Sequence, residues 1–310
     1  MSASPKASRS RLVGVALAGI VLGVVCAAFL LPARQAPPRP DIVVTIPPLA
    51  WLAQRLAPEL EVRTLVPVGV SPHAYQLTPR DASDLRSARV VMSVGPFIDD
   101  AARRVIDARV EGGHVSMHDV ATRRATDGPR AHVCTHEIRE PDAMDPHLWL
   151  DPHYMADGAI ALADELVALG LLDEPTARAR ALAIVEEIAV IDAAFHERLG
   201  ALGDRQMIVY HDAYRLWVHR YGLAMPMVLR TNDHAEVTPG AIASARAHAE
   251  ANGVRAIYAE PQFAIAGPKR LAEALGIELM MLDPVGGEDW PAMMRANLEA
   301  LERGLSREAL

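Results

Sequence analysis

The chain has 310 residues, of which 51% are hydrophobic and 23% charged, and its formal net charge is −8. This length allows one large domain or two ordinary ones, and the hydrophobic fraction excludes a chain that is disordered throughout. The acidic balance disfavours nucleic-acid binding, which normally requires a basic surplus, so no nucleic-acid partner is expected. Two cysteines are too few for a disulfide framework.

The N-terminal residues have the pattern of an export segment. Residues 1–11 carry Lys6, Arg9 and Arg11 and no acid, and an uncharged apolar run follows over residues 12–31. Residues 1–36 are therefore predicted to be a signal peptide or an N-terminal membrane anchor, because residues 12–31 are also long enough to span a bilayer. A Pro-rich linker is predicted over residues 37–40.

Export would change the charge of the folded part. Without residues 1–36 the chain loses four basic residues and no acidic ones, so its net charge becomes −12. We expect this part to be periplasmic or otherwise extracytoplasmic. An acidic exported protein suits a soluble partner or a cation as its ligand.

Strand and helix patterns alternate after the linker. Strands are predicted at residues 41–46, 62–68 and 89–94, and helices at residues 48–56 and from Thr78 onward. The Thr78-Pro79 pair supplies an N-cap followed by proline at the first helical position. This alternation is typical of a parallel sheet covered by helices.

The middle of the chain predicts two long helices. The first covers residues 154–169, and the second opens near Asp173 and continues with apolar residues three or four apart until Gly200 and Gly203. At 1.5 Å per residue, the second helix would be roughly 33 Å long. A rod of this length can connect two lobes.

The strand–helix alternation then resumes. Strands are predicted at residues 206–210, 226–229, 256–259 and 277–282, and helices at residues 213–221, 238–252, 268–275 and 291–305. We therefore predict an α/β fold of two lobes, each a mainly parallel sheet flanked by helices, joined by one long rigid helix. The predicted domains are an N-terminal lobe (41–173), a linker helix (174–202) and a C-terminal lobe (203–310).

Four side chains are candidate metal ligands. His73, His211 and Asp283 each follow a predicted strand, and ligands of open α/β sheets bind outside the carboxyl ends of the strands. His147 lies in the turn-rich segment DPHLWLDPH. Two candidates belong to each lobe, so they could converge if the lobes face each other. Three imidazoles and a carboxylate suit tetrahedral Zn²⁺, whereas manganese prefers more oxygen ligands; manganese and iron stay open as alternatives.

Five segments around these residues resemble one protein family. They are SPHAYQLTPRD (71–81), DPHLWLDP (145–152), HDAYRLWVHRYGL (211–223), AEPQF (259–263) and LDPVG (282–286). In this order they resemble the zinc/manganese solute-binding proteins of bacterial ABC importers, from about residue 41 to the C-terminus.

The resemblance implies a function as well as a fold. It implies that a rigid helix joins the lobes and that one transported metal lies in the cleft on His73, His147, His211 and Asp283. Histidine rather than glutamate at the third position, His211, indicates a zinc carrier. The implied partner is a metal ABC permease in the membrane, and the protein is expected to be a monomer.

Some residues depart from the family pattern or have a minor predicted role. The segment before His147 is short for a zinc carrier, and its residues His132, Cys134 and His136 could form a weak accessory metal site or simply a flexible polar loop. His153 is interpreted as structural or as supporting the ligands, and Trp149 as packing beneath the site. Glu260 lies in a family motif but is not predicted to be a ligand.

Two other functions fit parts of the sequence pattern. A site closed by four protein ligands has no open position for substrate, which argues against an enzyme, although the His211-Asp212 pair is also found in metal-dependent hydrolases. The other alternative is a surface adhesin or interaction module, which would need no metal. Metal capture requires neutral imidazoles, so affinity should weaken as the pH falls below about 6.5.

Overall fold

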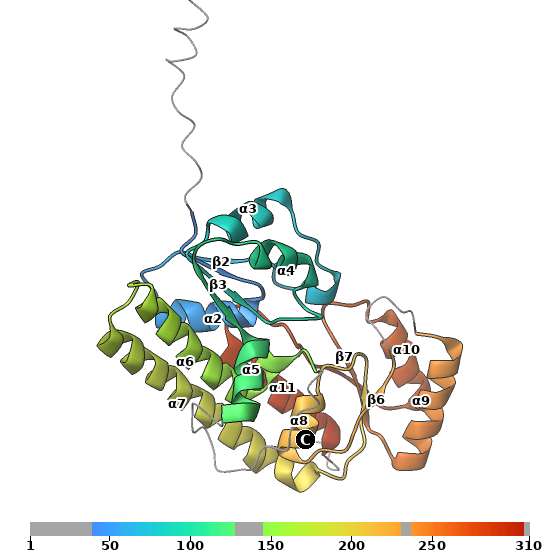
Figure 1. Cartoon of the computed structure of the whole chain (residues 1–310). Coiled ribbons are helices and arrows are strands. Elements are labelled where there is room, and N and C mark those ends of the chain that lie inside the picture. The colour runs from blue at the N-terminus through green and yellow to red at the C-terminus, as the bar shows by residue number, and fades with distance from the viewer. Residues whose placement is uncertain (1–38, 128–144, 231–236, 307–310) are drawn as a thin grey trace, which may run out of the picture. The chain divides into compact units, whose positions relative to one another are not determined.

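Two four-stranded parallel sheets form the framework of the protein (Figure 1). In this computed structural model, residues 39–127, 145–230 and 237–306 are described, and residues from Pro40 onward belong to one compact unit. The first sheet has the order β2-β1-β3-β4 and the second the order β6-β5-β7-β8, so the two lobes share one topology. The strands are β1 (Ile42–Val44), β2 (Val62–Thr64), β3 (Val90–Ser93), β4 (Gly113–Ser116), β5 (Ile208–Val209), β6 (Met227–Val228), β7 (Ala256–Ala259) and β8 (Glu278–Met281).

Helices cover both faces of each sheet. The described helices are α2 (Pro47–Leu56), α3 (Pro79–Ser87), α4 (Asp100–Asp107), α5 (Met117–Asp127), α6 (Pro152–Ala168), α7 (Glu174–Leu199), α8 (Arg215–Tyr221), α9 (Pro239–Asn252), α10 (Ala266–Leu275) and α11 (Trp290–Leu305). The predicted N-caps are confirmed: Thr78 accepts a hydrogen bond from the amide of Asp81 in a capping box, and Thr238 accepts one from Ala241. These caps satisfy amides that the first helical turn leaves without partners.

The two lobes share one hydrophobic core. Side chains alternate across each strand, so Ile42 and Val44 of β1 face a large core that also contains α2, α6, α7, α8 and α11, while Val43 faces a smaller outer core. In the second sheet, Val209 and Tyr258 belong to the same large core. Because one core continues from lobe to lobe, large hinge motions between them would expose buried apolar surface.

The long helix α7 links the lobes as predicted. It contains 26 residues, begins at the Asp173 cap and continues into a short 3-10 turn, Gly200–Leu202. Its apolar side packs on α6 along much of its length, with Ile184, Ile188 and Ile191 buried. The predicted fold class, two parallel-sheet lobes joined by a long helix, is thus confirmed.

Three elements of the first lobe had no counterpart in the sequence prediction: α4, β4 and α5. The strand β4 reads GHVS and offers only one large apolar side chain, Val115, for pattern recognition. It forms because it pairs in parallel with β3, and because Gly113 allows close packing against Glu165 of α6. Here tertiary packing outweighs local propensity.

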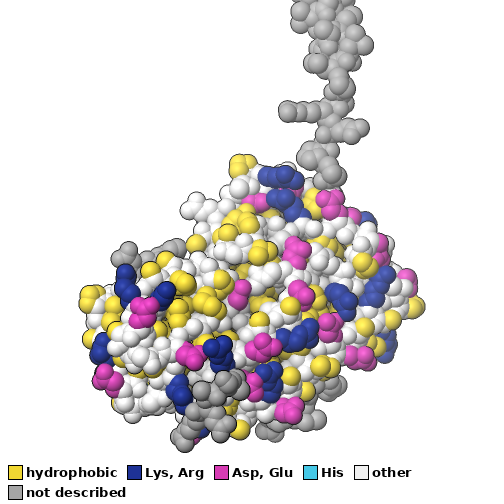
Figure 2. Space-filling view, turned by 180° about the vertical axis from the view of Figure 1, so that it is seen from behind, with side chains coloured by type: hydrophobic (Ala, Val, Ile, Leu, Met, Phe, Trp, Pro, Cys, Tyr) yellow, Lys and Arg dark blue, Asp and Glu magenta, His cyan; other side chains and the backbone are white. Residues whose placement is uncertain are grey.

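Parts of the prediction lie outside the described residues. These are the signal peptide or anchor (1–36) and the group His132, Cys134 and His136. Among the described helices, none combines the length and apolar character needed to cross a membrane. On the face seen from behind, acidic and basic side chains are interspersed with hydrophobic ones (Figure 2).

Candidate metal centre

His73 lies in the loop that follows β2 in the first lobe. It belongs to the 3-10 turn Pro72–Ala74, and the backbone beyond this turn is fixed by the buried carboxylate of Asp81. Asp81 accepts hydrogen bonds from the Tyr75 hydroxyl (2.7 Å) and from Arg63 (2.9 Å). Burial, followed by the hydrogen bond to Asp81, raises the pKa of Tyr75 to about 12. The family motif at residues 71–81 therefore contains both His73 and the residues whose hydrogen bonds hold its loop in place.

His147 precedes the short turn Leu148–Leu150, which three indole groups hold in place. Trp149 donates to the carbonyl of Pro284 (2.5 Å), Trp290 to the carbonyl of Trp149 (2.7 Å) and Trp217 to the carbonyl of Leu150 (2.7 Å). Trp290 and Trp217 belong to α11 and α8, so the position of His147 is tied to the second lobe. Trp149 is fully buried with its ring centroid 5.4 Å from that of His147, in agreement with the prediction that it packs beneath the site.

His211 follows β5 of the second lobe, at the carboxyl end of the sheet. Its side chain is buried, and its ring lies edge-on to Phe263, with centroids 6.2 Å apart. The guanidinium carbon of Arg230 lies 4.5 Å from the centroid of the Phe263 ring, and this contact restricts the Phe263 ring on the side away from His211.

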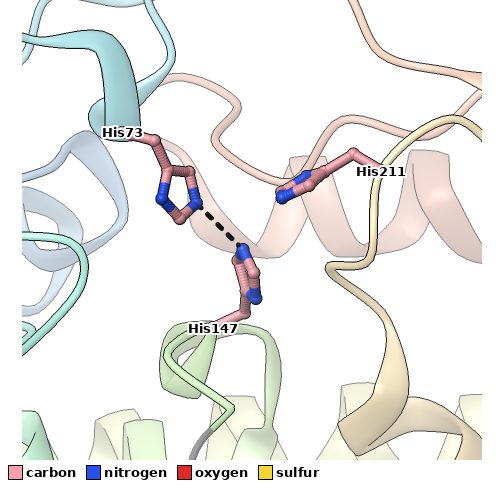
Figure 3. Close-up of side chains that lie close together, drawn as sticks. All are labelled: His73, His147 and His211. Atoms are coloured by element: carbon pink, nitrogen blue, oxygen red, sulfur yellow. Dashed lines mark hydrogen bonds between the residues drawn. The ribbon is translucent and has the colours of Figure 1, made fainter. Parts of the chain in front are cut away.

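The three histidines converge on one point, as Figure 3 shows. Their ring centroids form a nearly regular triangle with sides of 5.3, 5.3 and 5.0 Å. Each offers a ring nitrogen, and these nitrogens all lie within 4.8 Å of one another; His73 Nε2 and His147 Nε2 are 3.2 Å apart. Two ligands on a tetrahedral Zn²⁺ with Zn–N bonds of about 2.05 Å are separated by about 3.3 Å, so this pair already has the spacing of a zinc site.

The space between the histidines suits a single ion. The cavity has a volume of about 10 Å³ and is lined by the three imidazoles together with Trp149, Gln262 and Phe263. This is the room needed for roughly one water-sized sphere. An organic substrate would not fit.

Two of the histidines have a carboxylate next to the ring nitrogen that faces away from the cavity. Asp145 Oδ1 lies 2.9 Å from His147 Nδ1 and also accepts a hydrogen bond from the backbone amide of His147. Glu260 Oε1 lies 3.3 Å from His211 Nδ1. Such carboxylates fix the tautomer that leaves Nε2 available and raise the basicity of the ligand. The sequence prediction missed both partners; the D-P-H spacing and the AEPQF motif were the signals that could have indicated them.

Glu260 is unusual even for a supporting carboxylate. It is 1% exposed, and apart from the approach of His211 Nδ1 neither of its buried oxygens has a partner in hydrogen-bond geometry among the described residues. Buried carboxylates are normally hydrogen-bonded, because leaving them unpaired costs free energy. A cation bound to the adjacent histidines would compensate this negative charge.

Asp283 does not join the three histidines in this structure. It follows β8, but its oxygens are not within 4.8 Å of all three imidazole nitrogens. Its Oδ1 accepts hydrogen bonds from Gln262 Nε2 (2.6 Å) and from the amides of Val285 (3.0 Å) and Gly286 (2.7 Å). Gly286 adopts a positive φ of 60°, where a Cβ would collide with Met293, so this turn requires glycine.

His153 and Asp212, which also lie in the family motifs, contact arginine side chains. His153 is buried between two guanidinium groups, 3.1 Å from both Arg124 and Arg220, and burial followed by Arg220 lowers its pKa to about 4. It therefore supports the fold, one of the two roles predicted for it. Asp212 is ion-paired with Arg215 (2.7 Å) and is not part of the histidine cluster.

Two α/β lobes with a shared core and a cluster of three imidazoles, two of them buried and one partly exposed, define a metal-binding protein of the two-lobed type. A family described as "Zinc-uptake complex component A periplasmic" matches residues 42–304. The chain belongs to this family of solute-binding proteins of metal ABC importers.

Individual relatives agree with this assignment. The chain is 26% identical over 265 residues to the high-affinity zinc uptake system protein ZnuA of Yersinia pestis, covering 79% of this chain and 83% of that protein. It is 22% identical over 256 residues to the manganese-binding lipoprotein MntA of Halalkalibacterium halodurans, covering 79% and 81%. The fold matches the periplasmic zinc-binding protein TroA of Treponema pallidum with a TM-score of 0.73 at 18% identity, over 87% of this chain and all of that one.

Proposed function

We propose that this chain captures one Zn²⁺ ion between its lobes and delivers it to an ABC permease in the membrane. The observation that carries the proposal is the convergence of His73, His147 and His211 on a cavity sized for one ion. Asp283 is the proposed fourth ligand. Since three donors already occupy its Oδ1, the carboxylate would approach the ion through its other oxygen.

The donor set favours zinc over manganese. Three nitrogen ligands and one carboxylate oxygen match the tetrahedral preference of zinc, whereas manganese suits sites with more oxygen. The similarity to a manganese-binding lipoprotein keeps manganese as the alternative cargo. The 3.2 Å spacing of the first two imidazole nitrogens fits two ligands on one ion, and the choice of zinc rests on the donor types.

The site is built for binding rather than for catalysis. Four protein ligands leave no position for an activated water, and the cavity has no room for an organic substrate. The hydrolase alternative used the His211-Asp212 pair, but Asp212 forms an ion pair with Arg215. We expect the zinc-loaded protein to show no hydrolysis of phosphate or carboxylate esters.

Delivery would follow export. We propose that the protein acts outside the cytoplasm, as a monomer, after export through its N-terminal segment (1–36) or while anchored by residues 12–31. The shared core ties the lobes together. Metal release would therefore depend on local movement of the loops that carry His73 and His211 rather than on a wide opening of the lobes.

Calorimetric titration of the exported protein with zinc tests the proposal. One tight site per chain is expected, and His211→Ala should weaken it at least tenfold. His219→Ala is the matched control, because His219 is an exposed residue of α8 and does not line the cavity. Absence of zinc binding would refute the function, and a clear preference for manganese would refute the choice of cargo.

A further inference from the structure

Gln262 is the side chain that connects the metal cavity to Asp283. It lines the cavity, whereas Asp283 does not, and its Nε2 donates to Asp283 Oδ1 at 2.6 Å. The other two donors to Oδ1 are the amides of Val285 and Gly286, which belong to the turn of Asp283 itself. Among the described residues, Gln262 is thus the donor that reaches this oxygen from another loop, the one that follows β7.

The second end of the Gln262 amide is also informative. Its Oε1 is buried and has no hydrogen-bond partner among the described residues. A glutamine with a purely structural role would normally use both ends of its amide, because an unpaired buried acceptor costs free energy. Gln262 uses only the end that contacts the proposed ligand.

From this contact we propose that Gln262 determines metal specificity by restricting Asp283 to one coordinating oxygen. The inference rests on the proposed function, since it concerns the fourth ligand of the same site. With Oδ1 held by Gln262 and the turn amides, only Oδ2 can reach the ion. Three imidazoles and one oxygen complete a tetrahedral zinc site, whereas a bidentate carboxylate would raise the coordination number toward that preferred by manganese.

Gln262 is therefore a positioning residue, and its removal should alter specificity rather than only affinity. Gln262→Leu keeps a similar volume but removes the donor on the cavity side of Oδ1. We expect the ratio of Mn²⁺ to Zn²⁺ affinity, measured by calorimetry on the full-length exported protein, to rise at least tenfold. Cobalt gives a separate readout: the strong visible absorption of four-coordinate Co²⁺ should weaken in the variant as the coordination number rises.

Two further variants separate positioning from a general effect on the fold. Gln54→Leu is the matched control, because Gln54 also donates to a carboxylate, that of Glu288 at 3.0 Å, but is exposed and does not line the cavity. It should leave the affinity ratio unchanged. In an Asp283→Asn background, Gln262→Leu should no longer change the ratio, because the group through which it acts has been altered.

The outcomes distinguish this inference from the proposed function. An unchanged affinity ratio in Gln262→Leu, with one intact zinc site, would overturn the role of Gln262 and leave zinc capture standing. A change that persists in the Asp283→Asn background would also overturn it, since Gln262 would then act through another group. If the unaltered protein binds no zinc, the proposed function and this inference both fail.

Discussion

Replacing Glu260 should have opposite effects on metal affinity and on the stability of the metal-free protein. Glu260 lies 3.3 Å from His211 Nδ1 and is almost fully buried. Glu260→Leu removes both the carboxylate that lies beside His211 Nδ1 and the negative charge near the cation. Glu260→Gln removes the charge but keeps an acceptor for the ring N–H.

The magnitudes follow from these contacts. Loss of a carboxylate behind a ligating histidine typically costs 10- to 100-fold in affinity, so we expect zinc binding to weaken about tenfold in Glu260→Gln and about 100-fold in Glu260→Leu. In the metal-free protein, Leu replaces two buried oxygens that have no hydrogen-bond partner among the described residues. Its free energy of unfolding should therefore rise by about 1–3 kcal/mol.

Zinc competition titrations and chemical denaturation with a chelator present would measure the two effects. Glu59→Leu is the control, since Glu59 forms an exposed ion pair with Arg180 and does not line the cavity. The reasoning would be refuted if Glu260→Leu bound zinc as tightly as the unaltered protein while its metal-free form became less stable. That result would make Glu260 a structural residue.

Three other measurements bear on the same account. His153 has a folded-state pKa of about 4, below its ordinary value of 6.5, so the unfolded chain takes up the proton first and stability is lost as the pH falls from 6.5 toward 4. Because the side chain is 1% exposed, the unfolding free energy of the metal-free protein, relative to that of His153→Gln, should fall by about 2 kcal/mol between pH 8 and pH 5. A difference that does not depend on pH would contradict the buried neutral imidazole. Asp99, the buried residue that precedes α4, behaves oppositely, because burial raises its pKa to about 6 and the folded state then binds the proton first. Relative to Asp99→Asn, the unaltered protein should gain about 1 kcal/mol of unfolding free energy as the pH falls from 8 to 5. Denaturation curves that showed a loss would exclude this assignment. Zinc at 1,000 times its dissociation constant should stabilise the fold by about 4 kcal/mol in thermal unfolding, and an equal gain in His211→Ala would show that the ion binds elsewhere.

Much of this architecture was predictable because local signals and tertiary structure agree. The Thr-Pro pairs at Thr78 and Thr238 start helices as expected, and the apolar spacing after Asp173 gives the long helix α7. Three of the four predicted ligands converge because two of them follow parallel strands in equivalent lobes. Strand ends and helix caps are encoded within a few residues, so a single sequence reveals them.

The features that were missed depend on contacts between distant segments. The strand β4 has a weak pattern of its own and forms by pairing with β3. The hydrogen bond from Gln262 to Asp283 connects residues 21 positions apart in the chain. The contact between Glu260 and His211 connects two loops at the end of the second sheet. Such contacts depend on side-chain geometry, which spacing along the chain does not encode.

X-ray absorption spectroscopy of the zinc-loaded protein tests the central claim most directly, because it counts the ligands on the bound ion. We predict one Zn²⁺ per chain with three imidazole nitrogens and one carboxylate oxygen, all at about 2.0–2.2 Å. The imidazole signal should fall by one in His211→Ala. A sulfur ligand, or fewer than three imidazoles in the unaltered protein, would contradict a zinc site formed by His73, His147 and His211.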